Sequence, residues 1–162
     1  MKIVVFSDSH GIRDYMTREL KKLVKHATIN YIIHLGDLVR DAQFLQENFP
    51  DIPVLYVCGN CDYTYDRREQ EKEYELGGKK FFILHGDTRR VKYSPESLEN
   101  IAAQKDYDII LYGHTHEPRK NYTADTYIIN PGSISYNRDG RGRSYCVIDI
   151  AGDNMGVNII YV

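Results

Sequence analysis

The stretch KIVVFSDSH, residues 2–10, joins an uninterrupted apolar run to a cluster of polar side chains. Two further apolar runs of this kind occur at residues 31–35 and 54–57. Runs without polar alternation are typical of strands that are covered on both faces. Between the runs, residues 14–26 and 40–49 place apolar side chains at helical spacing. The order strand, helix, strand, helix, strand predicts a parallel sheet with right-handed crossovers.

The second half of the chain is dominated by shorter strands. The dipeptide Gly77-Gly78 predicts a tight hairpin turn between strands at residues 74–76 and 79–84. We expect Ser94 to cap a third helix that starts at Pro95 and runs to Gln104. Further strands are predicted at residues 108–112, 119–123, 126–130, 144–150 and 157–161. The pattern as a whole predicts an α/β fold with two packed sheets flanked by helices, in a single domain over residues 1–162.

The composition excludes several classes of protein. The chain has 162 residues, with 21 Lys and Arg against 23 Asp and Glu, so its formal net charge is −2. This balance argues against a broad nucleic-acid footprint, and no window approaches the roughly 18 apolar residues of a membrane span. Three cysteines, an odd number, favour a reducing compartment. Because the first apolar run is also too short for a signal peptide, we expect a cytoplasmic protein without membrane or nucleic-acid partners.

Polar side chains follow five of the predicted strands, at the point where each strand ends. The clusters are Asp8-x-His10, Gly36-Asp37, Gly59-Asn60, His85-Gly86 and Gly113-His114-Thr115-His116. Ligands of open α/β sheets gather at this edge. Each cluster alone is also compatible with a turn or a helix cap. Five clusters at five strand ends favour a common site.

Together the clusters offer more metal ligands than one ion needs. The seven candidate ligands are Asp8, His10, Asp37, Asn60, His85, His114 and His116. A single first-row ion takes about four to six ligands, so this set favours two divalent ions that share a carboxylate. Two such ions roughly 3.5 to 4 Å apart form the clamp used for in-line displacement at phosphorus. Mixed oxygen and imidazole ligands suit Mn²⁺, which we expect first, and also Ni²⁺, Fe²⁺, Co²⁺ or Zn²⁺.

In their order along residues 2–150, the clusters resemble the signature of the calcineurin-like metallophosphoesterases. More narrowly, the chain is similar to the small single-domain bacterial and archaeal phosphodiesterases of that family. The resemblance implies a β-sandwich flanked by helices, and a dinuclear metal site in which Asp37 bridges the two ions. It also implies the other ligands: Asp8, His10 and His116 for one ion, and Asn60, His85 and His114 for the other.

Two positions depart from the pattern of many relatives. Cys61 stands where these relatives have a histidine that protonates the leaving oxygen, and a thiol is a poor substitute for imidazole near neutral pH. Asp87 stands where relatives often have a second histidine. If its carboxylate faces the site, it would oppose a dianionic monoester more than a monoanionic diester. Both departures favour small phosphodiesters as substrates.

Further residues are candidates for substrate contact. Cys61 and Asp62 follow the third cluster, Ser133 lies in a turn similar to that of the same branch, and Arg138 lies in the next loop. The alternatives for Ser133 and Arg138 are an ordinary tight turn and a solvated loop charge. We expect specificity to depend on the loops at residues 63–68, 89–93 and 136–143.

Two other patterns have simpler interpretations than a functional site. His34 lies inside an apolar run, so we expect a core histidine rather than a ligand. Cys58-x-x-Cys61 lacks the second pair of a zinc ribbon, and it follows a strand rather than opening the helix of a thioredoxin-like unit.

Two functions from different classes remain. The first is a dinuclear phosphodiesterase in which a hydroxide bridging the metals attacks phosphorus in line, with His10 and Asn60 orienting it and Asp37 holding both ions. The second is a non-catalytic protein-interaction module, because a vacuolar-sorting subunit of retromer resembles this family. All seven ligand positions are filled here, which favours catalysis. The apolar ends of the terminal strands would permit a homodimer or homotetramer.

Overall fold

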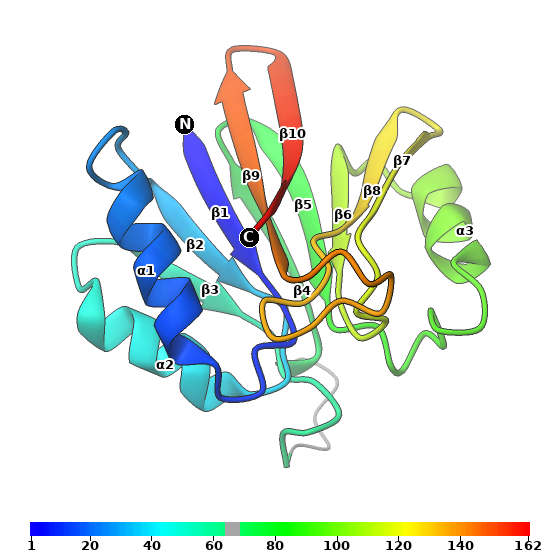
Figure 1. The fold of residues 1–162 in the computed structure, drawn as a ribbon. Helices are drawn as coiled ribbons and strands as arrows, with labels where there is room; N and C mark the ends of the chain where they lie inside the picture. Colours follow the sequence, from blue (N-terminus) through cyan, green and yellow to red (C-terminus); the bar gives the residue numbers. More distant parts are fainter. Residues whose placement is uncertain (64–68) are drawn as a thin grey trace.

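The computed structural model describes residues 1–63 and 69–162, and it contains two five-stranded sheets packed face to face (Figure 1). The first sheet comprises β1 (Lys2–Phe6), β2 (Tyr31–His34), β3 (Val54–Tyr56), β9 (Ser144–Ala151) and β10 (Asn154–Tyr161). Its spatial order is β10-β9-β1-β2-β3. The second sheet comprises β4 (Glu71–Leu76), β5 (Lys79–Leu84), β6 (Ile109–Tyr112), β7 (Arg119–Thr123) and β8 (Thr126–Asn130), in the order β4-β5-β6-β8-β7.

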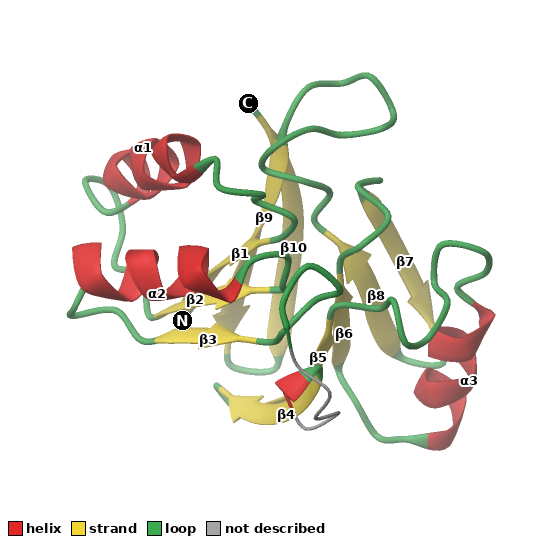
Figure 2. Cartoon of the chain, turned by 90° about the horizontal axis from the view of Figure 1, so that it is seen from below, coloured by secondary structure: helices red, strands yellow, loops and turns green. Residues whose placement is uncertain are grey.

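In the described part of the chain, three helices cover the outer faces of the sandwich. The helices α1 (Arg13–Leu23) and α2 (Val39–Asn48) lie over the first sheet, and α3 (Glu96–Gln104) lies over the second (Figure 2). None of the helices in the described residues combines the length and the apolar character needed to cross a bilayer. The predicted α/β sandwich with flanking helices is therefore confirmed. Of the loop at residues 63–68, to which we assigned specificity, residues 64–68 lie outside the described part of the chain.

Alternation along the central strands explains why their sequences are apolar throughout. In β1, Ile3 and Val5 face the second sheet, whereas Val4 and Phe6 face α1 and α2. In β5 the same alternation directs one set of side chains into the sandwich and the other, including Leu84, against α3. Both faces of each strand are thus buried, so polar alternation is absent from the sequence.

The parallel pairing predicted for the first half of the chain is confirmed. Val5 pairs with Ile33 in β2, and Ile33 pairs with Leu55 in β3. In the second sheet β5, β6 and β8 are also parallel to one another. The carboxyl ends of the parallel strands within each sheet therefore meet at one edge, where the polar clusters follow.

Several element ends differ from the sequence predictions. Strand β4 begins at Glu71 rather than at residue 74, because its first half is a polar strand edge paired with β5. Strand β10 begins at Asn154, three residues early, since it continues to the turn that joins it to β9. Helix α1 ends at Leu23 instead of residue 26. The third helix begins at Glu96, one residue later than expected, although the Ser94 hydroxyl does accept the Glu96 N–H at 3.1 Å.

Candidate metal centre

The predicted ligands follow the carboxyl ends of strands from both sheets. Asp8 follows β1, Asp37 follows β2, and His85 directly follows β5. Hydrogen bonds join these segments: within the first sheet the Asp8 N–H donates to the Gly36 carbonyl at 3.3 Å, and between the sheets the His114 N–H donates to Asp8 Oδ2 at 3.0 Å. The site is therefore built where the two sheets approach each other at one edge.

Backbone strain is concentrated in these segments. Five of the seven predicted ligands have left-handed backbone conformations, with φ between 46° and 67°: Asp8, His10, Asp37, His114 and His116. The other described non-glycine residues with positive φ are Arg90, Ala124 and Asp125. This conformation costs about 1 kcal/mol or more for a residue with a Cβ. Such strain persists where the surrounding structure enforces it, and it is typical of functional sites.

One group of ligand atoms lies between the ends of β1 and β6. It consists of Asp8, His10 and His116, whose ligand atoms all lie within 4.8 Å of one another. His116 Nε2 is 3.3 Å from Asp8 Oδ1 and 3.2 Å from His10 Nε2. These three residues are the ones that the family resemblance assigns to a single ion.

A second group contains Asp8, Asp37 and His85, again within 4.8 Å of one another. His85 Nε2 lies 3.5 Å from Asp37 Oδ1 and 3.1 Å from Asn60 Oδ1. His114 is not within either group, but its ring packs edge-on against the His85 ring with centroids 5.1 Å apart. The structure thus gathers all seven predicted ligands. Asp37 forms a third group with His10 and Cys61, so Asp8 and Asp37 are each shared between two groups.

Backbone carbonyls fix the histidine tautomers. His85 Nδ1 lies 2.7 Å from the Leu35 carbonyl, and His116 Nδ1 lies 3.0 Å from the Tyr136 carbonyl. A carbonyl only accepts, so in both rings Nδ1 carries the proton, and in the neutral form of each ring the lone pair of Nε2 is free to bind a cation. This carbonyl-imidazole arrangement is the usual support of metal-ligating histidines.

The carboxylate of Asp8 shows most directly that the cluster fits a cation. Asp8 is fully buried, and its Oδ1 has no hydrogen-bond partner in the described part of the chain. Burial alone would raise the pKa of Asp8, but the neighbouring imidazole of His116, together with that of His85, lowers it to about 2. An ionised, buried oxygen without a donor is costly unless a cation neutralises it. The residues therefore fit divalent metal ions.

Two glycines allow the ligand segments to approach closely. A Cβ at Gly59 would lie 2.4 Å from Asp37 Oδ1, and a Cβ at Gly113 would lie 2.0 Å from the Ser7 hydroxyl. Either contact is far inside van der Waals distance. The glycines in these two motifs are thus required by packing around the carboxylates.

Cys61 and Asp62, two predicted substrate contacts, occupy different positions. Cys61 is exposed, its N–H donates to Asp37 Oδ1 at 2.9 Å, and its sulfur lies within 4.8 Å of ligand atoms of His10 and Asp37. The Asp62 carboxylate accepts the N–H groups of Val39 at 2.8 Å and Gly59 at 3.0 Å. Cys61 is therefore at the rim of the site, whereas Asp62 joins the start of α2 to the Asn60 loop.

Ser133 differs from the substrate contact that we expected. It is fully buried, and its hydroxyl donates to the Asp8 carbonyl at 2.8 Å while accepting the N–H groups of Ser135 and Tyr136. The hydroxyl holds the loop after β8 against the backbone of Asp8, so Ser133 stabilises the position of Asp8 and does not face the substrate. Arg138 is exposed, and its N–H donates to the His116 carbonyl at 2.9 Å.

A buried network behind the site was not predicted. The carboxylate of Asp41, in the first turn of α2, accepts the Ser9 hydroxyl at 2.7 Å, the Gly11 N–H at 2.8 Å and Arg13 Nε at 2.7 Å. Ser9 lies between the ligands Asp8 and His10. The available signal was that Asp41 falls on the same helix face as Ala42 and Leu45, which are buried.

His34 completes this network and is buried, as expected for a core histidine. The Ser9 hydroxyl is committed to Asp41, so His34 Nε2 donates to the Ser9 oxygen at 3.0 Å, and His34 Nδ1 accepts the Gly36 N–H at 3.3 Å. Both ring nitrogens are thus satisfied in the neutral form. Burial lowers the pKa of His34 to about 4, against the opposing charge of Asp41.

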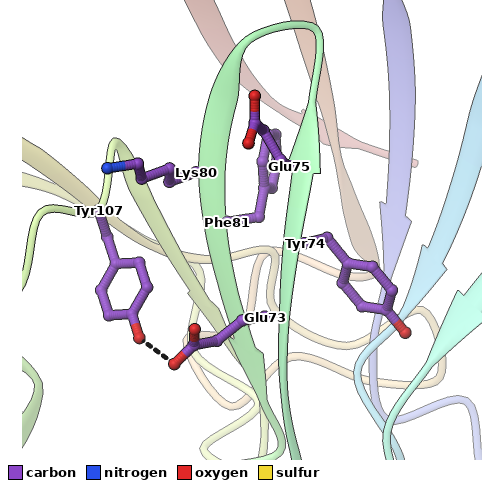
Figure 3. A pocket seen from close by; sticks show the side chains of 6 residues that line it. All are labelled: Glu73, Tyr74, Glu75, Lys80, Phe81 and Tyr107. Carbon is purple, nitrogen blue, oxygen red and sulfur yellow. Dashed lines mark hydrogen bonds between the residues drawn. The ribbon is translucent and has the colours of Figure 1, made fainter.

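A cavity on the β4–β5 hairpin shows a contrasting arrangement (Figure 3). It has a volume of about 270 Å³, and the Tyr107 hydroxyl donates to the Glu73 carboxylate across it. Its lining includes none of the predicted ligands. The strained, metal-compatible cluster at the strand ends is therefore the better candidate for chemistry.

Comparison with known sequences agrees with this placement of the site. The sequence profile of the calcineurin-like phosphoesterase superfamily domain matches residues 1–153. The probable metallophosphoesterase YsnB of Bacillus subtilis is 30% identical over 156 residues, which cover 94% of this chain and 86% of YsnB. The phosphodiesterase YfcE of Escherichia coli is 27% identical over 169 residues, covering 92% of this chain and 88% of YfcE.

Solved structures show the same fold. A predicted phosphoesterase from Streptococcus pneumoniae superposes with a TM-score of 0.78 at 27% identity, covering 99% of this chain and 88% of that chain. Vps29 of Entamoeba histolytica, solved as a complex with Zn²⁺, superposes with a TM-score of 0.74 at 19% identity, covering 100% of this chain and 98% of that chain. From its sequence profile and these relatives, the chain belongs to the calcineurin-like phosphoesterase superfamily.

Proposed function

We propose that this protein is a phosphodiesterase that uses two divalent metal ions, with Mn²⁺ as the preferred metal. The observation that carries the proposal is the ionised, buried Asp8 oxygen, which has no hydrogen-bond donor in the described residues and faces imidazole nitrogens. The phosphodiesterase YfcE, which is similar over most of the chain, supports the same chemistry. Seven ligands around one cluster support two ions rather than one.

We assign Asp8, His10 and His116 to one ion and Asn60, His85 and His114 to the other. The bridging role of Asp37 is supported by its position between the two sets. Its carboxylate forms one group with His85 and another with His10.

The burial of the ligands divides them into a floor and a rim. Asp8, Asp37 and His85 are buried, whereas His10 and Asn60 are exposed. Bound divalent ions would supply positive potential and acidify a water molecule at neutral pH. The buried carboxylates of Asp8 and Asp37 would neutralise part of the charge of the bound ions. His10 and Asn60, at the exposed rim, can contact a ligand and orient the attacking nucleophile.

The rim also favours diesters. Cys61 lies beside Asp37, and the family resemblance assigns its position to the histidine that protonates the leaving oxygen in many relatives. A thiol is a weaker proton donor than an imidazolium, so a substrate with a good leaving group is favoured. Asp87 lies two residues after His85, and if its carboxylate faces the site it would oppose a dianionic monoester more than a monoanionic diester.

The experiment is hydrolysis of bis-p-nitrophenyl phosphate by the purified protein with added Mn²⁺. We expect turnover with metal, and a loss of roughly 10³-fold or more in Asp37→Ala, equivalent to about 4 kcal/mol in the barrier. Asp51→Ala, which removes an exposed carboxylate in the loop before β3, serves as the matched control and should retain activity. Absence of turnover with Mn²⁺, Ni²⁺, Co²⁺, Zn²⁺ and Fe²⁺ alike would contradict the proposal.

The second candidate function is a non-catalytic protein-interaction module, which we retain because the chain shares its fold with Vps29. Metal binding without any turnover would favour this alternative. We also propose a cytoplasmic location, supported by three cysteines that form no disulfide, and a homodimer or homotetramer. Light scattering of the protein as it elutes from a size-exclusion column measures its molar mass, and therefore the number of chains in the oligomer.

A further inference from the structure

A small polar cavity is lined in part by Thr115, which lies between the predicted metal ligands His114 and His116. It lies between the loop before α3, the end of β6, the start of β7 and the loop after β8, and its volume is about 110 Å³. At about 30 Å³ per water molecule, it has room for three or four waters or one group of phosphate size. Its polar lining consists of Lys92, Tyr93, Tyr112, Thr115, Glu117, Arg119 and Arg138.

The lining is positively charged. Lys92, Arg119 and Arg138 face one acid, Glu117, so the formal charge of the cavity is 3 − 1 = +2. In the ranges 1–63 and 69–162, none of these three cations forms an ion pair, whereas Arg13, Arg89 and Arg141 are each paired with a carboxylate. Three unpaired cations around one small cavity attract an anion.

Hydroxyl groups add neutral donors to the cavity. The Thr115 oxygen accepts the Glu117 N–H at 3.2 Å and the Asn130 amide at 3.1 Å, so its own proton remains available to a ligand. Tyr112 is almost completely buried and lines the cavity, and a tyrosine hydroxyl is a hydrogen-bond donor at neutral pH. The cavity thus combines positive charge with hydrogen-bond donors, as anion sites do.

The cavity and the metal centre share one segment of backbone. Thr115 lies between His114 and His116, two predicted metal ligands. Arg138, which lines the cavity, donates its N–H to the His116 carbonyl at 2.9 Å. The cavity is therefore lined by one residue that lies between two predicted metal ligands and by another whose backbone is hydrogen-bonded to one of them.

We propose that the cavity binds a second anionic group of the substrate, a terminal phosphate attached to the diester that the metal centre holds. This inference rests on the proposed phosphodiesterase function and narrows its substrate class to diesters with an additional phosphate. Free phosphate has the same chemistry and is the other source of such an anion.

The test measures binding to the Mn²⁺-loaded protein by calorimetry. The probes are hydrolysis-resistant, phosphorothioate-linked dithymidines with no terminal phosphate, with a 5′-phosphate and with a 3′-phosphate, and inorganic phosphate alone is a separate arm. We expect one of the phosphorylated probes to bind at least about tenfold more tightly than the unphosphorylated one, as charge-assisted hydrogen bonds do. In Arg119→Gln and Lys92→Gln this ratio should fall toward one.

Lys25→Gln, which removes an exposed charge beyond the end of α1, is the matched control and should keep the wild-type ratio. Equal affinity for the three dithymidines, no binding of any of them, or a ratio that persists in both cavity variants would overturn the inference. Saturation of the cavity by inorganic phosphate with no effect of the terminal phosphate would also overturn it. Turnover of bis-p-nitrophenyl phosphate is measured separately, so failure of catalysis and failure of the anion site are distinguishable.

Discussion

Two buried aspartates lie at the same edge of the first sheet and differ in how far their oxygens are hydrogen-bonded. In Asp41 both oxygens accept hydrogen bonds, three in all, from Ser9, Gly11 and Arg13, and Arg13 balances its charge. Asp8 is equally buried and ionised; its Oδ2 accepts the Ser7 hydroxyl and the His114 N–H, whereas its Oδ1 accepts no hydrogen bond from the described residues.

The difference distinguishes the buried network that supports the site, formed by Ser9, His34 and Asp41, from the cluster of predicted metal ligands. Along three consecutive residues, the side chains of Asp8 and His10 join the ligand cluster, while Ser9 joins the network of Asp41 and His34. A fully satisfied buried network is rigid and holds the backbone in place. The network of Ser9, His34 and Asp41 can therefore hold Asp8 and His10 in their strained backbone conformations. Asp8 Oδ1, which lacks a donor, is left free to bind a cation.

The largest expected effect is on activity and comes from Asp8, whose Oδ1 has no hydrogen-bond donor in the described residues. Asp8→Asn keeps the shape of the side chain but removes the charge that would bind the ions. We expect turnover of bis-p-nitrophenyl phosphate to fall about 10³-fold, about 4 kcal/mol in the barrier, with a small change in the unfolding free energy of the metal-free protein. If Asp8→Asn prevents folding instead of abolishing activity, Asp8 has a structural role rather than a metal-binding one.

The second effect is on stability and comes from the satisfied aspartate. Asp41→Ala leaves the Ser9 hydroxyl, the Gly11 N–H and the Arg13 side chain without their acceptor. We expect about 3 kcal/mol of destabilisation and a melting temperature lower by roughly 6–12 °C, measured by urea and thermal unfolding. Glu47→Ala, at an exposed position of the same helix, should change stability by less than about 0.5 kcal/mol. Equal effects of the two variants would contradict the role given to Asp41.

The third effect is a pH dependence of stability that originates in His34. Its pKa is lowered to about 4 in the folded protein, from 6.5 when exposed, so the unfolded chain binds a proton first as pH falls. Stability from this group is fully present above pH 6.5 and decreases toward pH 4. Between pH 7 and pH 5 the loss is about 2 kcal/mol.

His34→Asn removes this titration. The difference in unfolding free energy between wild type and variant should therefore shrink by about 2 kcal/mol from pH 7 to pH 5, measured in the metal-free protein. A difference that is constant over this range would show that His34 does not titrate below its usual pKa.

The sequence predicted most of the fold because the strands are apolar on both faces and end in recognisable polar clusters. It also predicted which residues the structure gathers into the candidate metal centre, since each one follows a strand end. Asp41 escaped prediction because a buried acid on a helix face resembles an exposed one in sequence. Ser133 was misplaced because a turn serine does not reveal which way its hydroxyl points. The cavity of Lys92, Arg119 and Arg138 combines three distant segments, and only tertiary structure brings them together.

The smallest expected effect concerns substrate choice at the rim. Cys61→His introduces a side chain that can protonate a leaving oxygen near neutral pH. We expect the ratio of p-nitrophenyl phosphate to bis-p-nitrophenyl phosphate turnover to rise at least about fivefold, about 1 kcal/mol in relative barriers. Cys61→Ser retains the size without the imidazole and should change the ratio less than about twofold. An unchanged ratio in Cys61→His would rule out a leaving-group role for this position.

Titration of the metal-free protein with Mn²⁺, followed by calorimetry, tests the central claim most directly. The account predicts two ions bound per chain in the wild type, loss of binding in Asp8→Asn, and two ions still bound in a correctly folded Arg13→Gln, which perturbs only the satisfied network. No bound Mn²⁺ in the wild type, or unchanged binding in Asp8→Asn, would contradict it.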